Sequence, residues 1–124
     1  MRSWMVGLLC LIFGINCNQE QKRPYLIAEP RKLALGSVNT DTSYAIRYVI
    51  KNSGDADLLI DTATASCDCT IPVLGKRKLL PGDTTLLLVN FRPPDTGYFD
   101  KRIVIRSNSD SVFTIVSFNG LASK

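Results

Sequence analysis

The strongest constraint on the fold of this chain is a series of short runs in which apolar and polar residues alternate. The clearest run is 44–51, because side chains two residues apart share one face of an extended strand. Its apolar face carries Tyr44, Ile46, Tyr48 and Ile50. Turn-forming clusters such as 52–55 separate about seven runs of this kind, at intervals of roughly 8–12 residues. The sequence therefore predicts an all-β domain over residues 25–124, an antiparallel β-sandwich of about seven strands, with a small barrel as the alternative.

Aromatic residues are expected to hold the core of this domain, because the single tryptophan, Trp4, lies in the N-terminal segment. The candidates from the strand patterns are Tyr48, Phe91, Phe99 and Phe118. The run 84–91 is apolar at consecutive positions, including Leu86 and Leu88, so we expect its strand to be covered on both faces.

The first sixteen residues have the pattern of a secretion signal. Arg2 precedes an apolar run of about a dozen residues, which is too short to span a bilayer of roughly 30 Å. Cys17 follows directly, and the chain then becomes polar. This order is similar to a bacterial lipoprotein signal, in which the cysteine becomes the lipidated first residue. We therefore predict a signal peptide over 1–16, lipidation at Cys17 rather than Cys10, and a flexible tether over 17–24 that holds the domain near a bacterial membrane.

Composition excludes several kinds of chemistry. The chain has no histidine, so it contains neither a Ser–His or Cys–His nucleophile pair nor an imidazole metal ligand. The formal net charge of +4 comes from scattered lysines and arginines, and the densest basic cluster, 76–78, falls in a predicted turn. We therefore expect no catalysis, no cofactor and no nucleic-acid partner.

The order of motifs along the chain resembles the DUF1573 family of small immunoglobulin-like domains. The first group of matching positions is Tyr48, Ile50, Asn52 and Gly54, followed by Ser66-Cys67-Asp68-Cys69-Thr70. The second group is Pro81-Gly82, Leu87, Val89, Phe91, the alternating run from Gly97 to Asn108, and Gly120. The resemblance covers about 33–120 and implies an immunoglobulin-like sandwich in the bacterial cell envelope, and it implies no activity. Asp68 stands where the family typically has glycine, which matters if that position requires a positive φ.

Cys67 and Cys69 are the candidate reactive pair, and their spacing leaves four interpretations open. They form a local disulfide or thiol pair at a turn, a redox-active dithiol, a soft-metal site with two thiolates, or an intermolecular link. In an extended strand their Cα atoms would lie about 6.6 Å apart, so a disulfide requires a bend. A zinc site would need more ligands than the sequence offers, and we expect no metal site.

The function expected from these features is that of an envelope-anchored lipoprotein with a binding or scaffolding role toward a protein or glycan partner. The alternative is a thiol-redox or soft-metal protein that acts through Cys67 and Cys69. For a glycan partner, the candidate aromatic residues are Tyr25, Tyr44, Tyr48 and Tyr98, most of which are expected to serve packing.

Overall fold

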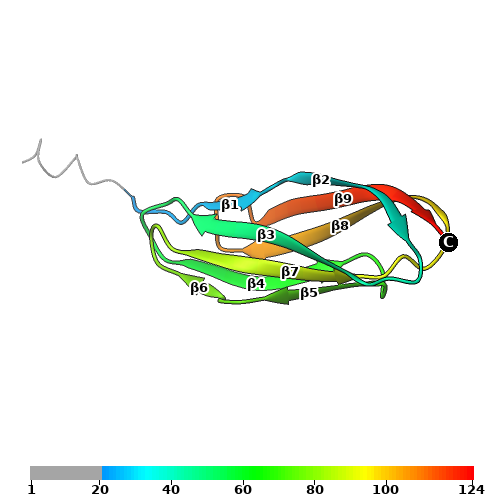
Figure 1. The fold of residues 1–124 in the computed structure, drawn as a ribbon. Helices are drawn as coiled ribbons and strands as arrows, with labels where there is room; N and C mark the ends of the chain where they lie inside the picture. The colour runs from blue at the N-terminus through cyan, green and yellow to red at the C-terminus, as the bar shows by residue number, and fades with distance from the viewer. Residues whose placement is uncertain (1–20) are drawn as a thin grey trace, which may run out of the picture.

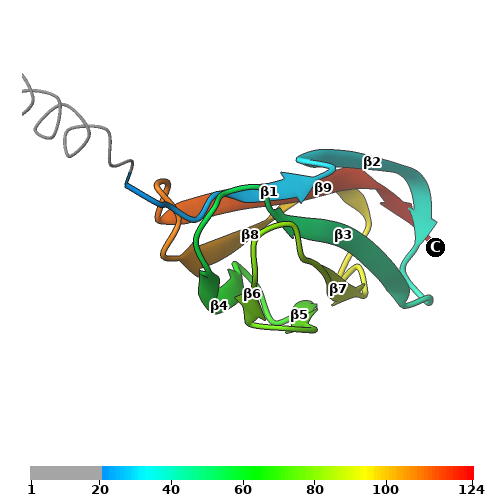
Figure 2. The same ribbon diagram turned by 90° about the vertical axis from the view of Figure 1, so that its left-hand side faces the viewer.

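The computed structural model describes residues 21–124, which form two β-sheets packed face to face (Figures 1 and 2). One sheet has four strands in the order β1-β3-β7-β5, and the other has five in the order β2-β9-β8-β4-β6. The strand bounds are β1 Leu26–Glu29, β2 Lys32–Asn39, β3 Tyr44–Asn52, β4 Leu58–Ala65, β5 Thr70–Leu74, β6 Lys78–Leu79, β7 Thr84–Phe91, β8 Gly97–Ser107 and β9 Phe113–Ser123. Residues 21–124 contain no helix that could cross a bilayer. The prediction of an all-β sandwich is confirmed.

Two details of that prediction were wrong. The described residues form nine strands rather than seven, because β5 and β6 were not anticipated: β5 contains Pro72, which is unfavourable in a strand interior, and β6 has only two residues. The sheets are also not purely antiparallel, since β2 pairs with β9 in parallel. β1 belongs to the four-stranded sheet, and the chain then continues as β2 along the edge of the other sheet (Figure 1).

The core lies between the two sheets and contains the predicted aromatic residues. Tyr48, Phe91 and Phe118 are fully buried, and Phe99 is nearly so. The Phe91 ring centroid lies 4.9 Å from that of Phe99 and 4.8 Å from that of Phe118, both in tilted or edge-on arrangements that aromatic pairs favour. Because Phe91 comes from one sheet and the other two rings from the opposite sheet, this cluster fastens the layers together.

Tyr48 carries the one polar group of the predicted core aromatics. Its hydroxyl donates a hydrogen bond of 3.0 Å to the backbone carbonyl of Ser117 on the opposite sheet. Burial disfavours the phenolate and raises the pKa of Tyr48 from 10.0 to about 12. The side chain therefore stays neutral and remains a donor over the physiological pH range.

The prediction that β7 is covered on both faces was wrong. Its inward residues are buried, but Leu86 on the outer face is 44% exposed and Leu88 is half-buried. Among the described residues, no element packs over the outer face of the four-stranded sheet (Figure 2). The apolar residues there form cross-strand pairs, Val49 with Leu86 and Leu88 with Val73.

The side chain of Asn52 is the hydrogen-bonding centre of one end of the sandwich. Its Oδ1 accepts from the backbone N–H groups of Tyr25 and Gly54, at 3.2 and 3.0 Å. Its Nδ2 donates to the carbonyls of Ala56 and Leu79, at 2.8 and 3.0 Å. Asn52 is fully buried, so each of these bonds replaces one that water would otherwise make.

The N-terminal segment is bound to the same end. Arg23 and Asp55 exchange two hydrogen bonds, from Arg23 N to Asp55 Oδ1 at 2.7 Å and from Asp55 N to the Arg23 carbonyl at 2.9 Å. Gly54 makes this approach possible, because a Cβ there would meet the Arg23 carbonyl oxygen and would lie 2.6 Å from Tyr25 N. Arg23, the next-to-last residue of the predicted tether, is thus bonded to the turn after β3. The predicted signal peptide, with Cys10, and the predicted lipidation site Cys17 lie outside the described residues.

Substitution of Asn52 by alanine should lower the free energy of unfolding by about 3 kcal/mol, because it leaves buried backbone groups without partners. Urea unfolding measures this loss. Asn90→Ala is the matched control: Asn90 is exposed on β7, and its loss should change stability by less than about 0.5 kcal/mol. Equal effects of the two substitutions would contradict the central role of Asn52.

Candidate functional site

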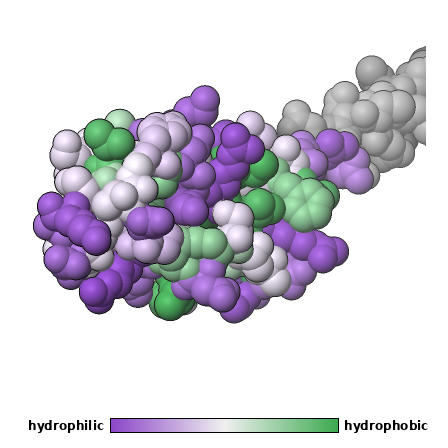
Figure 3. All heavy atoms as spheres, turned by 90° about the vertical axis from the view of Figure 1, so that its right-hand side faces the viewer, coloured by the Kyte–Doolittle hydropathy of each residue, from purple (hydrophilic) through white to green (hydrophobic). Residues whose placement is uncertain are grey.

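The two candidate cysteines lie in the loop that carries the chain from one sheet to the other. β4 of the five-stranded sheet ends at Ala65, and β5 of the four-stranded sheet begins at Thr70. This cysteine end of the sandwich is opposite the N-terminal end, where the chain enters β1 and where β3 ends (Figure 1). Viewed from the cysteine end, hydrophilic residues cover much of the surface and hydrophobic residues occur in separate small groups (Figure 3).

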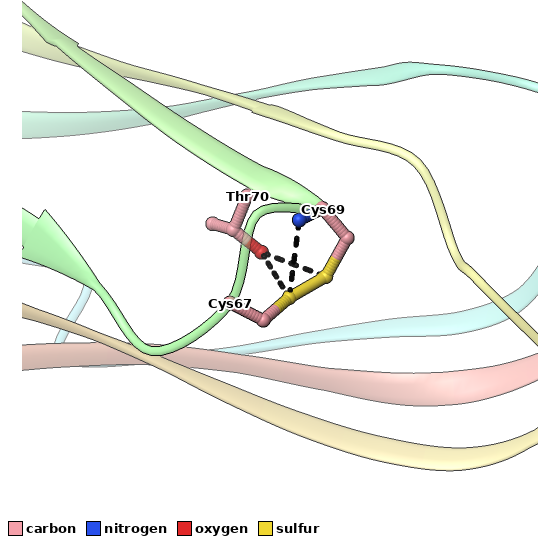
Figure 4. Close-up of a disulfide and its surroundings, with 3 residues drawn as sticks. All are labelled: Cys67, Cys69 and Thr70. Atoms are coloured by element: carbon pink, nitrogen blue, oxygen red, sulfur yellow. Dashed lines mark hydrogen bonds between the residues drawn. A yellow bond between two sulfur atoms is a disulfide. The ribbon is translucent and has the colours of Figure 1, made fainter.

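Cys67 and Cys69 are joined by a disulfide, with their Cα atoms 5.4 Å apart (Figure 4). The chain bends here, as a disulfide at this spacing requires, and Thr70 N donates to the Cys67 carbonyl at 3.2 Å. Asp68 adopts no positive φ, because only glycines do so among the described residues. The departure from the glycine of the family pattern therefore introduces no backbone strain.

Polar groups of the loop itself surround the sulfur atoms. The backbone N–H of Cys69 lies 3.3 Å from Cys67 Sγ. The hydroxyl of Thr70 lies 3.8 Å from Cys67 Sγ and 3.6 Å from Cys69 Sγ, within reach of both (Figure 4). Both cysteines are half-buried, whereas Thr70 is buried. Thr70 was not among the predicted site residues, although its position directly after Cys69 was a usable signal.

A cationic side chain beside a cysteine would lower the pKa of its thiol, but the basic cluster 76–78 and Arg47 do not lie beside the pair. Lys76 and Lys78 follow the other end of β5, and Lys76 N is bonded to Thr85 Oγ1 at 2.7 Å. Arg47 lies on β3 and pairs with Leu88, away from the loop. Arg92 is the cationic residue beside the loop, through a bond from its backbone N–H to the Cys69 carbonyl at 3.1 Å.

No group of three or more Cys, Asp or Glu side chains that could hold a metal ion occurs within residues 21–124. A soft metal would therefore have only the two thiolates of reduced Cys67 and Cys69 as ligands in this region. Two thiolates match a soft ion such as Cu(I), and they are too few for a structural zinc site.

The free edge of β5 is a poor site for strand addition. Cys69 and Gly75, which flank β5, bond to Arg92 directly after β7 and to Leu86 of β7. By the same register, Ile71 and Val73 of β5 direct their backbone groups toward β7. Pro72 falls between these positions, where an N–H would point away from the sheet. Proline supplies no such donor, so an incoming strand would lose a hydrogen bond there.

The four tyrosines considered for glycan contact differ in how much of their side chain is exposed. Tyr48 is buried in the core, and the hydroxyl of Tyr44 accepts a bond of 2.8 Å from Asn39 N. Tyr25 is half-exposed at the N-terminal end, whereas Tyr98 on β8 is 71% exposed and points outward. Of the four, only Tyr98 presents most of its ring to solvent.

The fold is a two-sheet β-sandwich that is similar to immunoglobulin-like and PapD-like domains. A PapD-like domain of human CEP192 aligns with a TM-score of 0.68 at 6% identity, covering 86% of this chain and 90% of that one. A protein of unknown function from Porphyromonas gingivalis gives 0.72 at 16% identity, covering 79% of this chain and 46% of that one. The secreted serine protease VesC of Vibrio cholerae gives 0.63 at 15% identity, covering 79% of this chain and 23% of the protease. The chain thus spans less than half of these two bacterial proteins.

Within this class, the chain belongs to the DUF1573 family, whose model matches residues 26–122 and is described as a protein of unknown function. The family membership inferred from the motifs is confirmed. A comparison of the sequence with curated proteins found no match. The family description gives no sign of catalysis, and the likeness to the protease concerns the fold alone.

Replacement of both Cys67 and Cys69 by alanine should lower the free energy of unfolding by no more than about 1.6 kcal/mol, because the disulfide closes a loop of only three residues. Urea unfolding of the oxidised protein and of the variant measures the difference. Asp68→Ala is the control, since it alters the same loop and keeps the disulfide. A loss above about 4 kcal/mol would contradict a minor role in stability.

Proposed function

We propose that this chain is a non-catalytic binding module, anchored by lipid at Cys17 to the bacterial cell envelope. The observation that carries the proposal is the attachment of Arg23 to the turn at Asp55. A chain anchored at Cys17 would reach the domain at this end. The cysteine end and the outer faces of both sheets would then be accessible to partners (Figure 1).

The exposed surface supports a binding role. The pairs Val49–Leu86 and Leu88–Val73 place apolar side chains next to one another across three strands of the four-stranded sheet. Apolar side chains that adjoin one another on an outer face are more typical of interaction surfaces than single exposed ones are. The absence of histidine and the family description, which names no activity, agree with binding rather than catalysis.

Substitution Cys17→Ala should abolish incorporation of radiolabelled palmitate and shift the full-length protein from the membrane fraction to the soluble fraction. The physical reason is that Cys17 would supply the thiol that carries the lipid, and one or more acyl chains provide the membrane affinity. Cys10→Ala is the matched control and should label like the wild type. Equal labelling of wild type and the Cys17 variant would refute the anchor.

Thiol–disulfide exchange at Cys67 and Cys69 is a second candidate function, favoured by the contacts of Thr70. In this reaction a partner dithiol would be oxidised to a disulfide, and its two electrons and two protons would convert Cys67–Cys69 to two thiols. The Thr70 hydroxyl and the Cys69 N–H would donate to the Cys67 sulfur and stabilise it as a thiolate. The loop would carry out this exchange at the end farthest from the proposed anchor.

If this second function is real, the pair should equilibrate with dithiol couples at a reduction potential above about −270 mV, the value for thioredoxin. Alkylation at defined ratios of reduced to oxidised glutathione, followed by mass analysis of the peptide that contains both cysteines, gives the potential. Thr70→Ala should slow alkylation of the reduced pair at neutral pH, whereas Thr64→Ala, an exposed control on β4, should not. A potential far below the thioredoxin value would leave only a structural role.

A further inference from the structure

A hollow of about 510 Å³ lies on the outer face of the five-stranded sheet, and neither candidate function above uses it. The floor of the hollow is formed by paired residues of β8 and β9. Tyr98, Asp100 and Arg102 alternate along β8 and therefore share the outer face. They stand directly opposite Leu121, Asn119 and Ser117 of β9.

The hollow combines one carboxylate with an excess of positive charge. Arg102 lies on its floor, and Arg31 and Lys32 line it from the start of β2, whereas Asp100 is the one acidic residue of the lining. The guanidinium of Arg31 is held across β9 by a bond from its Nε to the Ile115 carbonyl at 3.2 Å. None of these four charged residues takes part in the ion pairs formed among residues 21–124.

Tyr98 adds an aromatic surface to this charged site. Its ring is 71% exposed, and its cross-strand partner Leu121 is 54% exposed. A tyrosine in this position contributes little to the core, but it offers a flat apolar face together with a hydroxyl group. The pair Asp100–Asn119, one step along the same face, supplies hydrogen-bond acceptors and donors beside the ring.

We propose that this hollow binds an acidic polysaccharide. The apolar face of a pyranose ring would stack on Tyr98, and its hydroxyl groups would bond to Asp100 and Asn119. The carboxylate or sulfate groups of the polymer would pair with Arg102 and Arg31, since guanidinium matches planar oxyanions in two-point contacts. This inference deepens the proposed function, on which it rests, by naming the class of partner.

Charge favours this occupant over a second copy of the chain. Two such faces packed on each other would bring Arg31, Lys32 and Arg102 against the same cations, which is unfavourable. A ligand that carries anions at intervals and hydroxyl groups between them complements the surface. Single-stranded DNA and phosphatidylglycerol share the negative charge but present no pyranose ring.

The test is affinity electrophoresis of the full-length protein in mild detergent, through gels that contain polygalacturonate, heparin or neutral dextran. We expect polygalacturonate or heparin to retard the protein and dextran to leave its mobility unchanged. The first two polymers distinguish carboxylate from sulfate recognition. Tyr98→Ala and Arg102→Ala should each weaken binding by about tenfold, whereas Tyr98→Phe, which keeps the ring, should retain most of it.

Arg47→Ala is the matched control, because Arg47 is an exposed arginine on the outer face of the other sheet. Its loss should change the affinity by less than about twofold in 0.15 M salt, where distant charges are screened. Thermal unfolding establishes that each variant is folded. The proposal is overturned if neither acidic polymer binds, if Arg47→Ala weakens binding as much as Arg102→Ala, or if single-stranded DNA binds more tightly than both polymers. Palmitate labelling reports on the anchor separately, so failure here leaves that result intact.

Discussion

The buried amide of Asn52 holds together parts of the chain that are far apart in the sequence. Its two polar atoms make four hydrogen bonds, to the segment before β1, to the turn after β3 and to β6 on the opposite sheet. The backbone N–H of the same residue donates to the carbonyl of Asp83, and its carbonyl accepts from Gly82 N. Both partners lie in the turn before β7. The N-terminal end of the sandwich is thus closed by one fully satisfied side chain. The aromatic cluster around Phe91 joins the sheets by packing, and Asn52 joins them by directional bonds.

This closure gives the domain a defined orientation along the chain. Arg23 and Tyr25 are bonded to the turn after β3, where Gly54 leaves room for their backbone. The cysteine loop forms the opposite end, because β4 runs the length of the sandwich before the chain crosses between sheets (Figure 1). The charged hollow with Tyr98 lies on one outer face, and the apolar pairs around Leu86 lie on the other. The domain therefore presents three chemically different surfaces.

Period-two patterns were sufficient to predict the sandwich and the inward faces of its long strands, because burial of one sheet face is a local property of alternating residues. They failed where the local pattern was weak or misleading. β5 contains Pro72, which is tolerated because it occupies an edge. The apolar residues Leu86 and Leu88 suggested that β7 is buried on both faces. Among the described residues, however, no element packs over its outer face.

The residues of the candidate sites could be predicted from the sequence, but the contacts that these residues make could not. The cysteine pair could be found from spacing alone, but the contacts of Thr70 depend on the bend of the crossover. Tyr98 could be listed among four tyrosines, but its outward direction depends on the register of β8, where Phe99 takes the inward position. The role of Asn52 was hidden because its motif also reads as an ordinary turn signal.

Pro72 has a consequence for many copies of this domain held close together on one surface. Crowded sandwiches are at risk of joining edge to edge into continuous sheets, which is the first step toward fibrils. On the β5 side, a neighbouring molecule would find a missing donor in the middle of a five-residue strand. A single proline thus helps densely packed copies of the domain to avoid edge-to-edge association.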